Sequence, residues 1–191
     1  MNTLVGSTVR LEPLTAHHIP ALFTELGNDV AAWSWMLVIT PSSEAEIATI
    51  VNRYLAEFAA GTREPFAVIH LESGRTIGTT SFMDICVKDQ TVEIGSTIYA
   101  REFWRTRVNT ETKFLLLTEA FEVQGFNRVA LKTDNENKRS QAAIERIGAK
   151  FEGALRSHKI RPDGTLRDSM YYSILKREWP PVKANLQRIL G

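Results

Sequence analysis

The stretch "YAREFWRTRVNTETKFLLLTEAFE", residues 99–122, carries the chain from an extended segment into a helix. The segment before it, Thr91–Tyr99, alternates apolar and polar residues as a half-buried strand does. Apolar residues then recur at helical spacing, which predicts a helix over Thr110–Val123 that ends before Gly125. A strand that leads into a helix in this way needs a crossover to a parallel neighbour. The stretch therefore predicts a sheet with at least one parallel pair.

Other parts of the chain supply further helices and strands. Helices are predicted after Thr15, over Ser43–Phe58 and over Lys138–Ile147, where apolar side chains share one helical face. Alternating runs predict strands at Thr8–Leu14, Pro65–Leu71, Thr76–Ile85, Thr91–Tyr99, Arg128–Thr133, Lys150–Lys159 and Thr165–Leu175. This order predicts an α/β fold of mixed α+β type, with a mixed central sheet of about six to seven strands and helices on both faces. Residues 1–191 are expected to form a single domain, with 177–191 as a C-terminal tail.

Composition narrows the class of protein before any site is considered. The chain has 191 residues, of which 43% are hydrophobic and 24% charged, and its net charge is +1. So small a charge creates no global field for nucleic acid or a membrane surface, and neither is expected as a partner. No apolar window approaches the ~18 residues of a membrane span, and the N-terminus lacks the pattern of a signal peptide. The single cysteine, Cys86, cannot form an internal disulfide, which favours a reducing, cytoplasmic location.

The turn between the predicted strand and helix has the composition of an anion site. The first N–H groups of a helix have no partner within it, and the helix dipole favours negative charge there. Arg101, Arg105 and Arg107 add full charges that suit phosphate oxygens. The alternative is a solvated surface loop, which Glu102 and Glu111 favour because each would repel a nearby phosphate.

A second polar turn follows the next predicted strand, at residues 133–137. If the two strands lie side by side, both turns open at the same edge of the sheet, where open α/β sheets bind ligands. Asn137 and Ser140 are the candidates to face the gap between them. The alternative is a set of ordinary caps and turns, since Asn and Asp form both unaided.

Four segments carry a resemblance to a known family: "TVEIGSTIYARE" (91–102), "WRTRVNTETKFLLLTEAFE" (104–122), "NRVALKTDNENKRSQAAIERIGAKFEG" (127–153) and "RPDGTLRDSMYYSIL" (161–175). With the opening "VRLEPL" they cover most of the chain, and the sequence resembles the Gcn5-related N-acetyltransferase superfamily in its RimJ/RimL-type branch. The resemblance implies a splayed mixed sheet that binds acetyl-coenzyme A (acetyl-CoA) in a V-shaped gap between two parallel strands. It also implies an enzyme that acetylates a primary amine, with protein N-termini among the acceptors of that branch.

In that family a Q/R-x-x-G-x-G/A loop cradles the pyrophosphate of the cosubstrate. The matching window, residues 104–109, has Arg107 and Asn109 at the positions of the small residues. Asn109 is the tolerable replacement, because Asn enters the left-handed region more easily than most residues. The resemblance places the pyrophosphate on backbone N–H groups, with Arg105 or Arg107 pairing from outside. The amides implied are those of Arg107, Val108, Asn109 and Thr110.

Two further contacts follow from the resemblance by position. A backbone N–H at a bulge in the strand before the loop polarises the thioester carbonyl, which here points to Ile98 and Tyr99. Asn137 matches the residue that contacts the pantetheine arm.

Two proton transfers require side chains. Ser140 matches the position that protonates the leaving thiolate in the closest branch, with the tyrosines at 171–172 as the alternative. For the base that takes the amine proton, Glu93 comes first, because a carboxylate buried beside the gap would have a raised pKa. His158 comes second, since an imidazole needs little tuning, and Asp168 comes third. A purely structural position is the alternative for all three.

The acceptor is the least specified part of this interpretation. Residues 27–43 and 158–168 are expected to set acceptor specificity, with Trp33, Trp35 and Met36 either lining a cleft or packing a lid. The expected partner is a small-molecule or peptide amine that attacks directly in a ternary complex, with no metal, and the protein is expected to be a monomer or homodimer. The alternative is a non-catalytic binding or sensor module with weak or lost CoA binding, which the two missing glycines favour.

Overall fold

The computed structural model describes residues 1–191 and contains one eight-stranded sheet. The strand order is β1-β2-β3-β4-β5-β6-β8-β7, and only β5 and β6 are parallel. The strands are β1 (Leu4–Val5), β2 (Val9–Pro13), β3 (Arg63–His70), β4 (Thr76–Cys86), β5 (Thr91–Tyr99), β6 (Arg128–Asp134), β7 (Lys150–Ile160) and β8 (Leu166–Leu175). The predicted mixed sheet is confirmed. The extra strand is β1, whose two residues are too few to show alternation.

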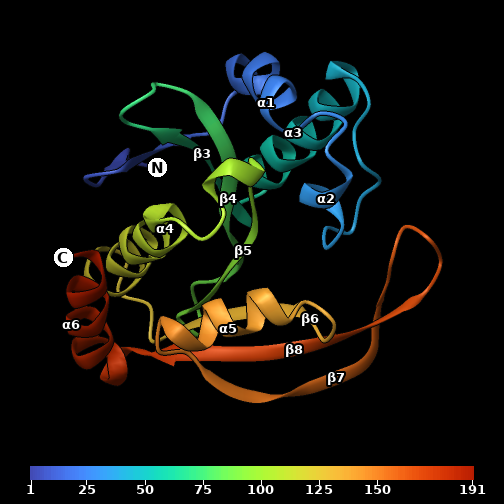
Figure 1. Ribbon diagram of the computed structural model, residues 1–191. Helices are drawn as coiled ribbons and strands as arrows, with labels where there is room; N and C mark the ends of the chain where they lie inside the picture. Colours follow the sequence, from blue (N-terminus) through green and yellow to red (C-terminus); the bar gives the residue numbers. More distant parts are fainter.

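Six α-helices cover the sheet: α1 (Ile19–Leu26), α2 (Val30–Trp33), α3 (Glu44–Ala59), α4 (Arg107–Thr118), α5 (Lys138–Arg146) and α6 (Trp179–Leu190). Figure 1 shows α1 to α3 on one side of strands β3 to β5, with α4 and α6 on the other side and α5 over β6. Helices on both faces of a mixed sheet are therefore confirmed. Short 3₁₀ turns occupy Ala16–His18, Arg101–Phe103 and Lys176–Glu178, and a π-helical turn over Glu119–Val123 extends α4.

Strands β5 and β6 separate soon after they meet. Their pairs are Thr91 with Arg128, Val92 with Val129 and Glu93 with Ala130. Further along β5, Ser96 has a φ of 47°, and the register with β4 shifts between Thr79 and Ser81. Such a bulge bends the strand and increases its twist. The ends of β5 and β6 therefore diverge, and each leads to the entrance of a helix, α4 or α5 (Figure 1).

Helix α4 begins at Arg107, three residues before the predicted start at Thr110. Thr106 has extended backbone, and its hydroxyl accepts a hydrogen bond from Val108 N at 3.3 Å. Threonine is a favourable N-cap because it satisfies an amide that the helix leaves without a partner. The prediction relied on apolar spacing, which starts later than the cap.

The predicted C-terminal tail is mostly the helix α6, and it docks on α4. Trp179, Val182 and Leu186 form its buried face. The Trp179 ring packs on Phe121 and Phe114, with ring centroids 5.4 and 6.3 Å apart. This docking brings the last turn of α6 to the entrance of α4.

Candidate active site

The entrance of α4 is an open, positively charged turn. Arg105 has a φ of 62°, in the left-handed region, and Thr106 then caps the helix. Asn109 lies inside α4, so the expectation that Asn109 would take the left-handed conformation is wrong. The left-handed residue is Arg105 instead, because α4 already begins at Arg107 and the turn must come before it. The amides of Arg107 and Asn109 have no backbone partner and can bind an anion.

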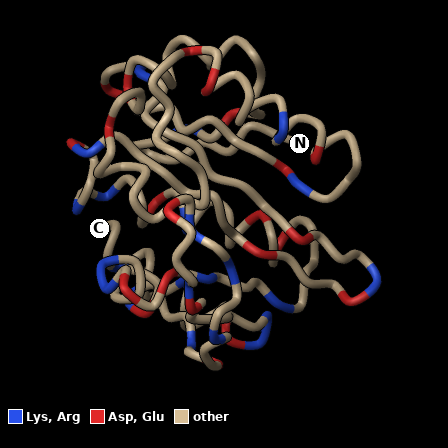
Figure 2. Tube along the Cα trace, turned by 90° about the vertical axis from the view of Figure 1, so that its right-hand side faces the viewer, with Lys and Arg blue, Asp and Glu red and all other residues tan.

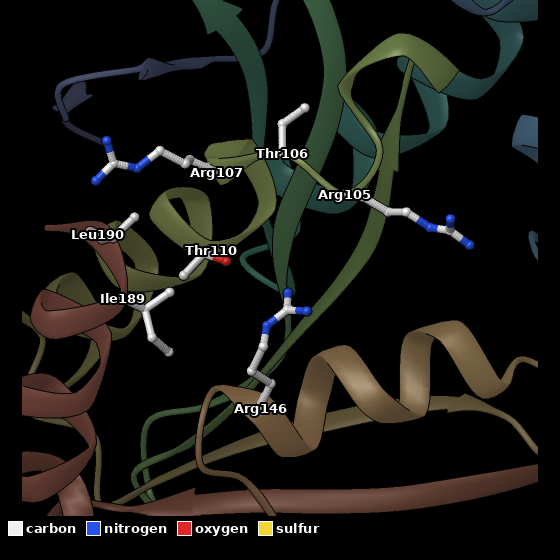
Figure 3. A pocket seen from close by; sticks show the side chains of 7 residues that line it. All are labelled: Arg105, Thr106, Arg107, Thr110, Arg146, Ile189 and Leu190. Atoms are coloured by element: carbon white, nitrogen blue, oxygen red, sulfur yellow. The ribbon is translucent and has the colours of Figure 1, made fainter.

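Three arginines border this entrance, and they come from two helices and the loop. A cavity of about 320 Å³ lies there, lined by Arg105, Thr106, Arg107, Thr110, Arg146, Ile189 and Leu190. Figure 3 shows Arg146 reaching from α5 toward Thr110, while Arg105 and Arg107 extend to opposite sides. All three arginines are exposed, and none forms an ion pair or a side-chain hydrogen bond. Sequence reasoning missed Arg146, which reaches the entrance only because α5 folds beside α4.

The two acidic residues of this segment are turned away from the entrance. Glu111 is 4% exposed, and its carboxylate accepts hydrogen bonds of 2.6–2.8 Å from the backbone N–H groups of residues 7–9 and from the Ser7 hydroxyl. Burial raises the pKa of Glu111, but these hydrogen bonds outweigh it and leave the pKa below its usual value. Glu102 pairs with Arg75. The repulsion that favoured a plain surface loop is therefore absent.

The end of β5 presents one amide to the gap. Just after β5, Ala100 N donates a hydrogen bond to the backbone oxygen of Ile77 in β4, at 2.9 Å. Because alternate N–H groups of a strand point to opposite neighbours, the Ile98 N–H is directed to β4 and the Tyr99 N–H to the gap. On that side Tyr99 O accepts a hydrogen bond from Trp104 Nε1 at 3.1 Å. Of the two residues predicted here, Tyr99 is placed to donate to a ligand in the gap.

The entrance of α5 carries the second group of predicted residues. Asn137 Oδ1 accepts from Ser140 N at 3.0 Å and caps α5, while no protein group accepts from Asn137 Nδ2. The Arg139 guanidinium lies 3.5 Å from the centre of the Trp104 ring. This contact joins the two entrances, so the first turn of α5, which contains Ser140, lies beside the α4 loop across the diverging strands.

Glu93 lies at the last β5–β6 pair, where the strands begin to diverge. It is 5% exposed, and its Oε2 accepts from Lys132 Nζ at 2.7 Å. Burial raises the pKa of Glu93, and the Lys132 charge opposes part of that rise. The predicted direction of the pKa is confirmed. Sequence reasoning missed Lys132, because nothing local marks it as a partner of a residue on another strand.

His158 lies on the same side of the sheet as this pair. Its Nδ1 is 3.0 Å from Ser169 Oγ, and its ring is 5.8 Å from the ring of Tyr171. Burial lowers the pKa of His158, and neighbouring cations, Lys159 and Lys132 among them, lower it further. The imidazole is therefore neutral near pH 7 and able to accept a proton.

A sequence profile described as "Acetyltransferase (GNAT) domain" matches residues 8–150, most of the chain. The chain belongs to the acetyltransferase (GNAT) family. Among curated proteins it is similar to "Putative ribosomal N-acetyltransferase YdaF" of Bacillus subtilis, with 30% identity over 173 residues that cover 90% of this chain and 92% of that protein. The resemblance drawn from the sequence is confirmed, including the RimJ/RimL-type branch, and this protein is an N-acetyltransferase.

Solved structures agree with this GNAT membership. A GCN5-related N-acetyltransferase from Brucella melitensis matches with a TM-score of 0.92 and 32% identity, covering 100% of this chain and 86% of that chain. Mycobacterium smegmatis RimJ, solved in complex with CoA-disulfide, matches with a TM-score of 0.85 and 19% identity, covering 98% of this chain and 94% of that chain. At that identity the second likeness shows the fold alone.

A buried lysine that sequence reasoning missed contacts β5 in this GNAT enzyme. Lys113 is 6% exposed, and its Nζ donates to Thr97 Oγ1 at 2.7 Å. Thr97 lies beyond the last β5–β6 pair, so this bond ties α4 to the diverging part of β5. Burial lowers the pKa of Lys113 to about 7, although Glu93 acts in the opposite direction.

The segments expected to select the acceptor have mixed outcomes. Trp33 is 4% exposed and its Nε1 donates to Leu26 O at 2.9 Å, so it packs the core rather than lining a cleft. Val30, Leu37 and Ile39 are the exposed large apolar residues of this segment, at 70%, 40% and 78%. Asp168, the third candidate base, accepts from Ser157 N at 2.7 Å and supports a bulge in β7.

The remaining features of this GNAT enzyme concern other classes of ligand. Figure 2 shows Lys and Arg intermixed with Asp and Glu along the whole trace, so no face is uniformly basic. No group of three or more His, Cys, Asp and Glu side chains is arranged to hold a metal ion. None of the helices has both the length and the apolar character needed to cross a membrane.

Proposed function

We propose that this enzyme transfers the acetyl group of acetyl-CoA to a primary amine in a ternary complex, and that the amine is the N-terminus of a protein or peptide. The observation that carries the proposal is the pair of helix entrances beyond the diverging ends of β5 and β6. One entrance has free amides and three arginines without partners, which suit a diphosphate. The printed name of the relative YdaF, a ribosomal N-acetyltransferase, supports a protein acceptor.

The residues present fit a nucleotide thioester, because its diphosphate, its pantetheine arm and its thioester carbonyl each have a donor without another partner. The amides of Arg107 and Asn109, together with Arg105 and Arg146, would hold the diphosphate. Asn137 Nδ2 would donate to the pantetheine arm, and Tyr99 N–H to the thioester carbonyl. Donors held by rigid elements before the reaction starts are the main source of electrostatic catalysis.

Proton transfer falls to the chain's own side chains. Bound acetyl-CoA supplies the activated acetyl group, and positioning of the amine beside it lowers the entropic part of the barrier. Glu93 takes the proton of the amine, directly or through water, because burial raises its pKa toward the neutral pH at which a base works best. His158, neutral near pH 7, is the alternative base. Ser140, at the first turn of α5, donates to the departing thiolate.

A non-catalytic module is the second candidate, and the arginine and asparagine in the glycine positions favour it. Arg105 nevertheless provides the left-handed turn, so the loop keeps an open shape without glycine. A measurement of free thiol released from acetyl-CoA separates the two, with a panel of peptide N-termini, polyamines, aminoglycosides and amino acids.

Thiol release that depends on one class of amine is the expected result. A rise in melting temperature with acetyl-CoA, but no thiol release with any amine, would favour the module. No rise at millimolar acetyl-CoA would contradict CoA binding itself.

A further inference from the structure

A cluster of buried charges lies on the same side of the sheet as Glu93 and His158, where β6 ends. Asp134, 2% exposed, accepts from Arg161 Nε and Nη2, each at 2.9 Å, and from Glu136 N at 2.9 Å. Glu93 accepts from Lys132 at 2.7 Å. Arg161 and Lys132 therefore occupy the two buried carboxylates of the cluster.

Arg167 is the remaining cation of the cluster, and it has no hydrogen-bond partner. The residue is 7% exposed, and its Nε is fully buried without a partner. The nearest carboxylate oxygen, Asp134 Oδ2, lies 3.8 Å from Nε, too far for a hydrogen bond. Burial lowers the pKa of the Arg167 guanidinium below its usual value. A buried cation without hydrogen bonds is costly, so its presence calls for an explanation.

The position of Arg167 connects it to the proposed chemistry. Along β8, alternate residues share a face, so Arg167, Ser169 and Tyr171 lie on one side of the sheet. Ser169 contacts His158, and the Tyr171 ring lies 5.8 Å from Lys132 Nζ, whose partner is Glu93. β8 extends past the last residue of β6, which pairs with Ser169, so Arg167 lies at the open end of the gap.

We propose that Arg167 binds a carboxylate of the acceptor, so that the acceptor is an amine with a carboxylate a few bonds away. The inference rests on the proposed acetyl transfer and specifies its substrate class. A guanidinium presents a planar pair of donors that matches the two oxygens of a carboxylate. With Arg167 on the carboxylate and Glu93 or His158 at the amine, the acceptor is held at two points.

Two other roles for Arg167 fit the structure less well. A structural partner of Asp134 is unnecessary, because Arg161 already makes two hydrogen bonds to that carboxylate. The phosphates of CoA have their own arginines at the entrance of α4. A carboxylate near the amine can come from two sources, the α-carboxylate of a free amino acid or the side chain of an acidic residue at a peptide N-terminus.

The test compares pairs of acceptors in which a carboxylate is replaced by the carboxamide of the same size. One arm pairs an amino acid with its carboxamide, and the other pairs C-terminally amidated peptides that begin with Asp or Asn. In the wild type, kcat/KM for the acid should exceed that for the amide by roughly ten- to hundred-fold in at least one arm, as expected for a charge-assisted hydrogen bond. The arm that shows the preference identifies the source of the carboxylate.

Two variants and a control locate the effect. In Arg167→Gln the preference should fall to about two-fold, mainly through KM for the acid, with KM for acetyl-CoA unchanged. Arg167→Lys should retain part of the preference, since the charge stays and the fork is lost. Arg156→Gln, which removes an exposed charge from the same hairpin, should keep the wild-type preference.

Equal rates for acid and amide in the wild type would overturn the inference while leaving acetyl transfer intact. A rise in KM for acetyl-CoA with an unchanged preference in Arg167→Gln would overturn it as well. If no amine is acetylated, the proposed acetyl transfer is wrong. The carboxylate site is then tested by the melting temperature of the protein with CoA plus either the acid or the amide. A shift with the acid alone, lost in Arg167→Gln, would support the carboxylate site, and equal shifts would exclude it.

Discussion

Two groups of cationic side chains in this molecule differ in burial and in whether they have a carboxylate partner. At the entrance of α4, Arg105, Arg107 and Arg146 are exposed and have no carboxylate partner. Near the end of β6, Lys132 and Arg161 are largely buried and each holds a buried carboxylate. Exposed cations stay hydrated until an anion arrives, whereas buried cations need a partner within the fold.

The comparison makes the exceptions informative. An unpaired cation at the surface costs little and is suited to a ligand that enters and leaves. In the buried group, Arg167 lies 3.8 Å from Asp134 Oδ2 but makes no hydrogen bond, which folding alone leaves unexplained and which points to a ligand. The carboxylates differ in the same way. The Glu111 carboxylate points away from the α4 entrance and binds the backbone of the N-terminal turn, whereas Asp134 pairs with a cation of the buried group.

The largest expected effect breaks the buried group. Asp134→Asn leaves Arg161 and Arg167 without their carboxylate and should lower the free energy of unfolding by about 3–5 kcal/mol. Urea unfolding measures the change, and Glu72→Gln, an exposed acid in a turn, serves as the control. A loss below about 1 kcal/mol would mean that the buried charges are compensated by water rather than by each other.

The next effect concerns the rate of transfer. Glu93→Gln removes the proposed base and should lower kcat about 100-fold, or about 2.7 kcal/mol in the barrier. Because the base acts when ionised and burial raises the pKa of Glu93, the rate should rise with pH through a value above the usual glutamate range. Lys132→Gln should move this rise in rate to still higher pH, because the Lys132 charge lowers the pKa of Glu93. A change of less than two-fold in Glu93→Gln would direct attention to His158.

A stabilising substitution is expected at the buried lysine. The folded pKa of Lys113, about 7, lies below that of an unfolded lysine, so the unfolded state binds more protons between these values. The free energy of unfolding of the wild type should therefore rise with pH above 7. Below pH 7 Lys113 is charged in both states, and the full cost of burying the charge lowers the stability. Lys113→Met should stabilise the protein at pH 6 to 7 by about 2 kcal/mol, less than the full cost because the bond to Thr97 is lost.

Unfolding at pH 6, 8 and 10 checks the prediction, since the advantage of Lys113→Met should shrink as the pH approaches 10. Lys88→Met, at an exposed position, should show no such trend. An equal destabilisation at every pH would mean that the buried ammonium is fully compensated.

The smallest effect sharpens the comparison from the exposed side. Arg146→Gln should raise KM for acetyl-CoA about ten-fold, or about 1.4 kcal/mol, and leave the melting temperature unchanged because Arg146 has no partner to lose. The difference should diminish at high salt, as for any exposed charge. Arg177→Gln is the matched exposed control, and an equal effect there would place the attraction in the overall field rather than at the entrance.

Apart from the two-residue strand β1 and the four-residue helix α2, the order of helices and strands was predictable from the sequence, because periodicity and turn residues act locally. The parallel step through residues 99–122 and the resemblance to the family followed from the same local information. The start of α4 and the left-handed residue were misplaced, at Thr110 and Asn109, because a cap such as Thr106 is a weaker signal than apolar spacing.

The sequence by itself determined the longer strands and helices, the crossover from β5 into α4, and the polar residues that follow β5 and β6. Only the tertiary structure decided the partners. It placed Arg146 at the α4 entrance, bound the Glu111 carboxylate to residues 7–9, and paired Asp134 with Arg161, which leaves Arg167 without a hydrogen bond. These choices join residues far apart in the chain, and they depend on burial and competition among charges, which no local pattern encodes.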